Sequence, residues 1–221
     1  MLSWMVGVNM TRLRVSPRSV PHVAAHMADE VLQSGISVYP GALSPELTLS
    51  MRAEAESLWD DDSFRFARVG AGEDKRLIPE IRSDRVCWWE DHDLSPAQQE
   101  YHAFLEHLRS EINQRTFMGL FDWEGHYAVY LEKTFYRRHL DVFAKAPSRQ
   151  ITVIAYLNHE WKQGDGGELR LYLDAEDRER YVDVPPLGGT VVVFESARFY
   201  HEVLMSNTPR HSVTGWFRTR G

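Results

Sequence analysis

The stretch QITVIAYL, residues 150–157, gives the clearest indication of the fold. It is a short apolar run rich in β-branched side chains, which is typical of a β-strand. Six more strand-like segments, separated by Gly, Pro, Asp or Asn, are found at 126–132, 168–173, 180–184, 190–195, 200–205 and 212–218. No helical pattern lies between them, so we expect antiparallel strands in a sandwich or jelly roll, not a parallel α/β sheet.

The N-terminal half has helical patterns instead. Residues 18–34 repeat apolar side chains at a helical period and end at a glycine, and residues 36–39 alternate like a short strand. A second helix is expected over 45–59, and Ser95 with Gln98 forms a capping box that predicts a third helix. We expect these helices to support the sheet.

The chain is expected to form one domain after a short tail. We assign 1–16 to an N-terminal tail and 17–221 to the domain, with helical support over 17–120 and the β-rich part over 121–221. Residues 60–83 combine acidic, glycine and proline positions, which predicts a long loop or a mobile two-stranded finger. A functional segment and a merely solvated excursion both stay open.

Composition excludes several classes of protein. A net charge of -7 and a pI near 5.8 argue against a nucleic-acid-binding protein. No apolar run is long enough to span a membrane, and residues 1–10 lack the basic leader of a signal peptide. Cys87 is the single cysteine, which excludes an intrachain disulfide and fits a cytoplasmic location. We therefore expect neither a nucleic-acid nor a membrane partner.

Three residues form a candidate metal site. His139 and Asp141 are two positions apart, so on a strand their side chains point to the same face. His201, from a distant strand, would complete a set of two imidazoles and one carboxylate, which suits Fe(II) and leaves coordination positions open. About one chance His-x-Asp is expected in a chain of this size, so the conjunction of residues carries the prediction.

Arg210, which follows the second histidine, supplies a candidate anion site. Its guanidinium matches a carboxylate at two points, and a dicarboxylate such as 2-oxoglutarate can bind a metal at one end and an arginine at the other. Tyr156, on the strand after the His-x-Asp pair, could donate a further hydrogen bond to that far carboxylate.

Other histidines and tryptophans have no such pattern. We interpret His92, His107, His126, His159 and His211 as surface or structural residues, because they lack ligand spacing with one another. We expect packing roles for Trp88, Trp89 and Trp161.

Together these residues resemble a known family. The similarity covers roughly residues 80–218 and rests on the segments YRRHLD (136–141), YLN (156–158), Trp161, GGEL (166–169), HEV (201–203) and Arg210 through Trp216. They resemble the prolyl-hydroxylase branch of the 2-oxoglutarate oxygenases, especially the oxygen-sensing HIF prolyl hydroxylases and their bacterial relatives. The chain differs from that pattern at residues 131–134 and at Gly215.

The resemblance implies a double-stranded β-helix (jelly roll, cupin-like) core buttressed by N-terminal helices. It implies roles for individual residues, by position only. Iron would bind His139, Asp141 and His201. 2-Oxoglutarate would be held by Arg210 and Tyr156, in a pocket lined by Tyr130, Leu169 and Thr214. A peptide substrate would contact Tyr136, Arg149, Trp216 and Asp84.

The resemblance also implies an activity: hydroxylation of a prolyl residue in a protein by Fe(II), 2-oxoglutarate and O2, with succinate and CO2 as products and ascorbate as a candidate additional reductant. Bacterial relatives suggest a translation factor such as elongation factor Tu as the substrate. Two alternatives stay open. One is the same chemistry on free proline or another small molecule, and the other is a non-catalytic cupin-like sensor domain.

Overall fold

The computed structural model describes residues 19–68, 76–90, 93–142 and 148–220. The predicted tail, residues 1–16, lies outside the described residues, as does His92. The described part contains three helices, α1 (Val20–Ser34), α2 (Pro45–Asp60) and α3 (Pro96–Thr116). Its strands are β1 (Ile36–Tyr39), β2 (Arg65–Phe66), β3 (Arg85–Trp88), β4 (Leu120–Tyr130), β5 (Tyr136–His139), β6 (Arg149–Tyr156), β7 (Leu169–Tyr172), β8 (Tyr181–Val184), β9 (Val191–Glu195), β10 (His201–Val203) and β11 (Arg210–Thr219).

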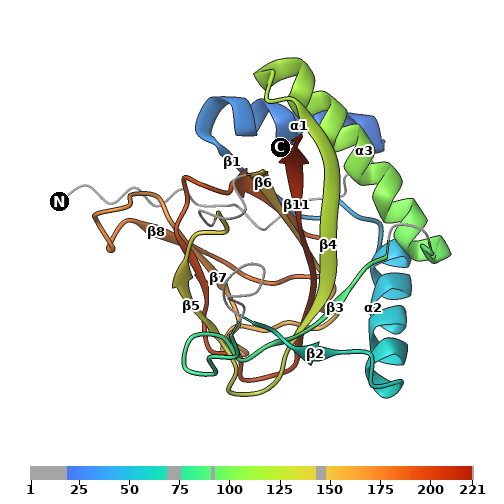
Figure 1. The fold of residues 1–221 in the computed structure, drawn as a ribbon, viewed down its shortest axis with the longest axis vertical. Helices are drawn as coiled ribbons and strands as arrows, with labels where there is room; N and C mark the ends of the chain where they lie inside the picture. The colour runs from blue at the N-terminus through green and yellow to red at the C-terminus, as the bar shows by residue number, and fades with distance from the viewer. Residues whose placement is uncertain (1–18, 69–75, 91–92, 143–147, 221) are drawn as a thin grey trace.

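The strands form two antiparallel sheets that face each other (Figure 1). The larger sheet has the order β1-β9-β6-β11-β4-β3-β2, and the smaller has the order β5-β10-β7-β8. Consecutive strands such as β9, β10 and β11 alternate between the sheets, as a jelly roll requires. This confirms the predicted mainly β architecture.

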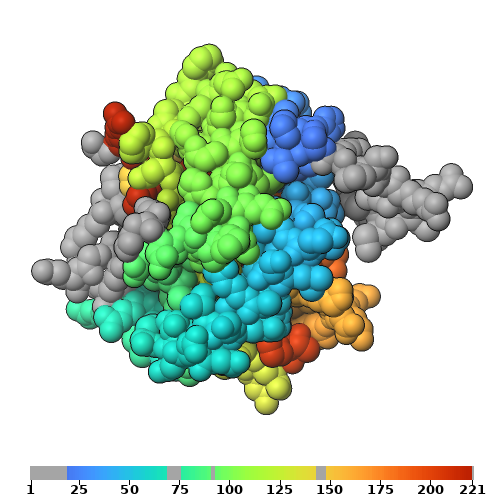
Figure 2. Space-filling model, turned by 90° about the vertical axis from the view of Figure 1, so that its right-hand side faces the viewer, coloured from blue at the N-terminus to red at the C-terminus, as the bar shows by residue number. Residues whose placement is uncertain are grey.

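The central strands of the larger sheet, β9, β6, β11 and β4, are buried on both faces, whereas the edge strand β2 is exposed. On β6, Ile151, Val153 and Ala155 pack under the helices, while Ile154 and Tyr156 face the smaller sheet. The three helices lie side by side over the outer face of the larger sheet (Figure 2). One hydrophobic core therefore lies between helices and sheet, and a second lies between the two sheets.

The capping box predicted at Ser95 is present at the start of α3. The Ser95 hydroxyl accepts the amide of Gln98 at 3.1 Å, and the Gln98 side chain accepts the amide of Ser95 at 3.2 Å. The Ser95 hydroxyl also donates to Glu54 of α2, which links the two helices.

Ser95→Ala should lower the free energy of unfolding by about 1 kcal/mol, because the first turn of α3 loses its cap. Urea denaturation measures the change. Ser50→Ala, at an exposed position inside α2, is the matched control and should shift stability by less than about 0.5 kcal/mol. Equal shifts in the two variants would contradict the cap's contribution.

Some boundaries differ from the sequence prediction. The strand predicted over 126–132 begins six residues earlier, at Leu120, because the Asn113 side chain bonds both the amide and the carbonyl of Leu120 and turns the chain out of α3. From the segment 60–83, the described residues include β2, which pairs with β3, and residues 69–75 lie outside the described part.

Gly215, where the sequence differs from the prolyl-hydroxylase pattern, has a packing explanation. It pairs with Gly125 across β11 and β4. A Cβ at Gly125 would lie 2.1 Å from the Trp123 ring, and one at Gly215 would lie 2.3 Å from it. The indole therefore lies flat over two glycines on the helix side of the sheet.

Candidate metal centre and cosubstrate pocket

The predicted triad comes together between the two sheets. His139 ends β5 and His201 begins β10, and the two residues are direct partners in the antiparallel register. Asp141 lies just beyond β5, not on a strand as expected. One ligand atom from each residue lies within 4.8 Å of the others. Each imidazole Nε2 is 3.5 Å from a different Asp141 oxygen.

Hydrogen bonds fix both imidazoles with Nε2 facing the centre. His139 Nδ1 lies 2.7 Å from the Arg137 carbonyl, and His201 Nδ1 lies 3.0 Å from the Phe199 carbonyl. Because a carbonyl only accepts, each Nδ1 carries the proton and each Nε2 presents a lone pair. Tyr136 stacks on the His139 ring at 3.6 Å between centroids and further restricts it.

Asp141 is held as a carboxylate. Burial alone would raise its pKa, but the two neighbouring imidazoles, first His201 and then His139 with its hydrogen bond, hold the pKa well below its usual range. The Thr152 hydroxyl donates to Asp141 at 2.8 Å and is itself 2.9 Å from the Ser196 hydroxyl. Burial lowers the pKa of His201 to about 4, so its imidazole is neutral at pH 7.

The triad has the donor chemistry that Fe(II) requires. Two imidazoles and one carboxylate converge from one side, which is the ligand set of non-haem iron oxygenases. The residues are largely buried, unlike an exposed cluster of acidic side chains. His139, Asp141 and His201 therefore fit a bound Fe(II) ion.

Arg210 is a buried cation near this centre. Its Nε donates to the Gly167 carbonyl at 2.8 Å and its Nη1 to the Ser212 hydroxyl at 3.1 Å. Among the described residues no carboxylate pairs with it, although its residue surface is only 3% exposed. A buried cation is costly without an anion. The fold therefore holds a positive charge ready for an anionic ligand.

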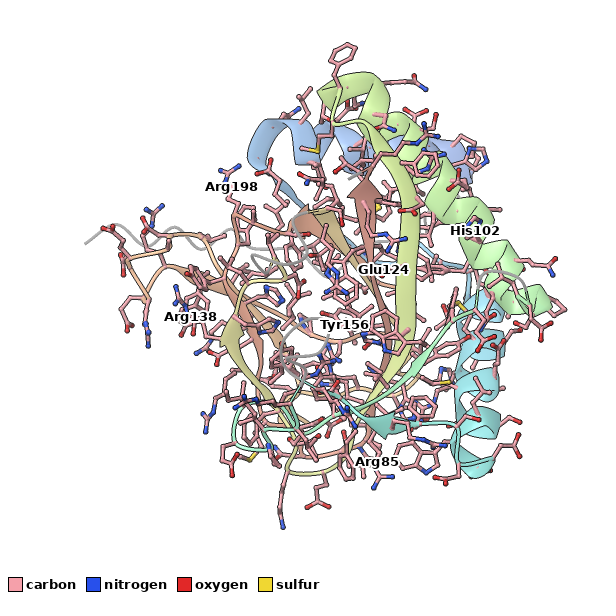
Figure 3. All side chains as sticks on the ribbon, viewed as in Figure 1. Arg85, His102, Glu124, Arg138, Tyr156 and Arg198 are labelled. Atoms are coloured by element: carbon pink, nitrogen blue, oxygen red, sulfur yellow. The ribbon has the colours of Figure 1, made fainter. Side chains whose placement is uncertain are left out.

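Two tyrosines flank Arg210. The guanidinium carbon lies 4.8 Å from the Tyr130 ring centroid and 5.0 Å from that of Tyr156. The Tyr156 hydroxyl is buried with no hydrogen-bond partner among the described residues, and burial raises its pKa to about 12, so it remains a donor. Figure 3 shows Tyr156 in the space between the sheets, whereas His102 of α3 lies on the outer side.

A small cavity of about 40 Å³ joins the triad to Arg210. Its walls include the predicted pocket residues Tyr130, Leu169 and Thr214. The three metal ligands and Arg210, which has no carboxylate partner among the described residues, line the same space, and the Tyr156 ring lies beside the guanidinium. This arrangement fits a dicarboxylate whose first carboxylate binds the metal, as 2-oxoglutarate does.

Gly167 makes room for Arg210. Its φ is +74°, and a Cβ there would lie 2.9 Å from Arg210 Cδ and 2.9 Å from the Ser206 hydroxyl. Gly164 also has a positive φ, of +100°, but a Cβ there would meet nothing within 4 Å. Gly167 therefore constrains the pocket, whereas Gly164 constrains only a turn.

Gly167→Ala should weaken 2-oxoglutarate binding roughly tenfold, as expected when one charge-assisted hydrogen bond worth about 1.4 kcal/mol is weakened. Gly164→Ala is the control: both variants carry backbone strain, but only Gly167→Ala should change the affinity. Titration of each Mn(II)-loaded protein with 2-oxoglutarate gives the constants. An unchanged constant in Gly167→Ala would mean that Arg210 does not depend on this close approach.

Comparison with known proteins places this site in a family. A model described as the 2OG-Fe(II) oxygenase superfamily matches residues 125–218. A crystal structure of a prolyl-4-hydroxylase from Pseudomonas putida is 35% identical in sequence, with a TM-score of 0.79, over 90% of this chain and 100% of that one. The chain belongs to the 2OG-Fe(II) oxygenases.

Other relatives of this oxygenase include prolyl hydroxylases. A Caenorhabditis elegans hypoxia-inducible factor prolyl hydroxylase is 26% identical over 89% of this chain, which spans 28% of that curated relative's length. A prolyl hydroxylase from Trichoplax adhaerens, solved with a hypoxia-inducible factor peptide, shares the fold with a TM-score of 0.80 at 21% identity, over 90% of each chain. These likenesses, with the two facing sheets, confirm the double-stranded β-helix.

The predicted substrate residues of the oxygenase divide into two groups. Tyr136, Arg149 and Trp216 line an open groove of about 690 Å³ that reaches Asp141. Asp84 does not line it, because its side chain is fully buried. Asp84 instead binds Arg82 through two contacts of 2.6 and 2.8 Å, and Arg82 lines the groove.

Sequence reasoning missed Arg82 and His126 as site residues. Burial alone would lower the pKa of Arg82, but the charge and hydrogen bonds of Asp84 raise it, so the ion pair persists. His126, interpreted as surface or structural, lines the cavity and the groove. Burial, followed by the charge of Arg82, lowers the pKa of His126 to about 3. Strand alternation could have found it, because His126 shares a strand face with Tyr130.

Proposed function

We propose that this oxygenase hydroxylates a prolyl residue in a protein substrate, using Fe(II), 2-oxoglutarate and O2. One observation supports the cosubstrate most strongly: Arg210, a buried arginine without a carboxylate partner among the described residues, lines the same small cavity as the metal triad. The ring of Tyr156, whose buried hydroxyl has no hydrogen-bond partner among the described residues, lies 5.0 Å from its guanidinium carbon. The similarity to the Pseudomonas putida prolyl-4-hydroxylase over that enzyme's full length supports the substrate class.

Different residues of the chain would bind the metal, bind 2-oxoglutarate and exclude water. Iron with 2-oxoglutarate and O2, when bound, supplies an oxidant that can hydroxylate an unactivated C–H bond, leaving succinate and CO2. His139, Asp141 and His201 would hold the metal from one side, so that other positions remain open. Arg210 and Tyr156 would bind the far carboxylate. Ile154 and Val203, which line the cavity, would exclude water from it.

The apolar side chains of Ile154 and Val203 line the cavity together with the triad. They offer no hydrogen bond to water, so a reactive centre would be sheltered on that side. The open groove lies on the other side, where Tyr136 and Trp216 border both spaces. A substrate side chain would therefore reach the metal from the groove.

The groove favours a polypeptide over the two alternatives. Free proline needs only a small closed pocket, whereas the groove has a volume of about 690 Å³, which leaves room for neighbouring residues of a chain. A non-catalytic sensor domain would not require the full set of His139, Asp141, His201 and Arg210. Elongation factor Tu is the candidate substrate by analogy with bacterial relatives.

The finer parts of the proposal concern location and regulation. The single cysteine supports a cytoplasmic location. None of the described helices has the length and hydropathy needed to cross a bilayer.

Likeness to a hypoxia-inducible factor prolyl hydroxylase supports a role in oxygen sensing, to be tested through the oxygen dependence of turnover. Ascorbate should help to keep the iron reduced, which turnover with and without it would measure.

One experiment tests the function directly. The purified chain, with Fe(II) and 2-oxoglutarate, is incubated in air with elongation factor Tu and, separately, with free proline. Mass spectrometry should find a proline that gains one oxygen atom in the protein, with one succinate formed per hydroxylation. Oxidation of free proline alone would favour the small-molecule alternative. Absence of succinate with both substrates, although iron and 2-oxoglutarate bind, would favour the sensor.

A further inference from the structure

The groove beside the triad has a charge opposite to that of the whole chain. Among the described residues that line it are four arginines, Arg65, Arg68, Arg82 and Arg149, and one carboxylate, Asp141. That carboxylate is the candidate iron ligand. The complete chain has a net charge of -7, so this concentration of arginine is local.

Two of the four arginines have a carboxylate partner within 2.8 Å. Arg82 is bound by the buried Asp84. Arg149 donates to Glu124 at 2.8 Å, and its guanidinium carbon lies 3.6 Å from the Trp216 ring centroid. These two side chains are held by the protein itself, and Arg82 also lines the small cavity that contains the triad.

The other two arginines are available to a ligand. Arg65 has a side chain that is 72% exposed, and its ion pair with the exposed Asp62 is long, at 3.9 Å. Its hydrogen bonds go to backbone carbonyls. Arg68 is exposed and has no ion-pair partner among the described residues. Both follow α2, on or just after the edge strand β2.

Apolar side chains lie between these cations. Phe66, Leu77 and Trp88 line the groove with residue surfaces that are 53%, 50% and 44% exposed. Arg85 stacks on the Phe66 ring, with its guanidinium carbon 4.4 Å from the centroid. Exposed aromatic and arginine side chains together are typical of surfaces that bind a polypeptide.

We propose that this groove selects a substrate polypeptide with acidic side chains beside its target residue, which Arg65 and Arg68 bind. The proposal rests on the proposed function and names its specificity. A prolyl side chain carries no charge, so discrimination among proline-containing segments must come from flanking residues. Guanidinium groups recognise carboxylates at two points, which suits Glu or Asp. Nucleic acid is less suited, because its binding needs many phosphate contacts and only two cations are available here.

Peptide binding tests the proposal without turnover. The chain is loaded with Mn(II) and the unreactive 2-oxoglutarate analogue N-oxalylglycine. Fluorescein-labelled peptides with one central proline carry Glu, Gln or Lys at the flanking positions, on the N-terminal or the C-terminal side. For at least one side, fluorescence anisotropy should give a Kd about tenfold lower for the Glu peptide than for the Gln peptide, as expected for a charge-assisted contact. The Lys peptide should bind most weakly. The difference should shrink at high salt, because both arginines are exposed.

Charge reversal supplies the decisive variant. Arg65→Glu combined with Arg68→Glu should invert the order, so that the Lys peptide binds more tightly than the Glu peptide. The matched control reverses two arginines between β7 and β8, Arg178→Glu with Arg180→Glu, on the other side of the molecule from β2 (Figure 1). It changes the net charge equally and should leave the wild-type order intact. Unchanged 2-oxoglutarate binding in all variants would show that they fold.

Three results would overturn the proposal: equal Kd values for the three wild-type peptides, an order that survives the Arg65 and Arg68 reversal, or no binding of any peptide. A single-stranded oligonucleotide that displaces the Glu peptide at lower concentration than the unlabelled peptide would also overturn it, in favour of a nucleic-acid groove. The proposed function fails separately. If the peptides bind in the expected order but no proline gains oxygen with Fe(II) and 2-oxoglutarate, the acidic specificity stands and the hydroxylase activity does not.

Discussion

Asp141→Ala should abolish the conversion of 2-oxoglutarate to succinate while leaving the fold intact. Asp141 supplies the only carboxylate of the triad, and it lies 3.5 Å from the Nε2 atoms of both His139 and His201. Loss of groups that merely orient metal ligands costs about 10–100-fold in affinity or activity. Loss of the charged ligand itself should cost more than about 100-fold. Succinate formation at saturating 2-oxoglutarate measures the effect.

Two further variants make this result specific. Asp141→Asn keeps the shape and an oxygen that can accept from Thr152, but loses the charge, so it should also bind iron poorly. Asp60→Ala removes an exposed carboxylate at the end of α2 and should change nothing. Thermal melting reports on the fold, and binding of Mn(II) reports on the site. Succinate formation near the wild-type rate in Asp141→Ala would rule out the metal assignment.

Arg210→Lys should weaken 2-oxoglutarate much more than the metal. Lysine keeps the charge but cannot reproduce the planar fork or the bonds that Arg210 makes to Gly167 and Ser212. Loss of one charge-assisted hydrogen bond costs on the order of 1.5–3 kcal/mol, which corresponds to a roughly 10–150-fold increase in the dissociation constant. Titration with 2-oxoglutarate at saturating Mn(II) gives this constant.

The control for Arg210→Lys is Arg198→Lys, which alters an exposed arginine paired with Glu195 at 3.6 Å. It should bind 2-oxoglutarate as the wild type does. Mn(II) affinity in the absence of 2-oxoglutarate should be similar in all three proteins. If Arg210→Lys retains the wild-type constant, then Arg210 does not contact the cosubstrate, and the far carboxylate must be bound elsewhere.

Local sequence patterns predicted most of the elements because their causes are local. The capping box at Ser95 and the glycine that ends α1 act within one helical turn. The apolar run that includes β6 marks a strand whatever its neighbours are. The start of β4 was missed because it depends on Asn113 of α3, seven residues before Leu120. A side-chain contact of this kind leaves no hydrophobic periodicity.

The candidate site was predictable only where chemistry and spacing coincide. His139, Asp141, His201 and Arg210 stood out because their types match a metal and a carboxylate. The position of Asp141 beyond β5 depends on the chain path after the strand, which the two-residue spacing does not specify. The burial of Asp84 behind Arg82 depends on the pairing between β3 and β4, and the local sequence around Asp84 does not show that pairing.

The indole of Trp123 over Gly125 and Gly215 has a consequence for how this sequence can evolve. A β-branched residue at 215 is sterically incompatible with the ring, and its Cβ would also lie 2.5 Å from the backbone oxygen of Glu124. It would therefore be accepted only if residue 123 becomes smaller and the neighbouring backbone of β4 shifts. The reverse order, a small residue at 123 first, leaves a void under the helices. The three positions should therefore covary among close homologues, with Trp at 123 accompanied by glycine at both other sites. Thr214 and Trp216 flank Gly215 and line the cavity. Their backbone position therefore depends on the close packing of Trp123 against Gly215.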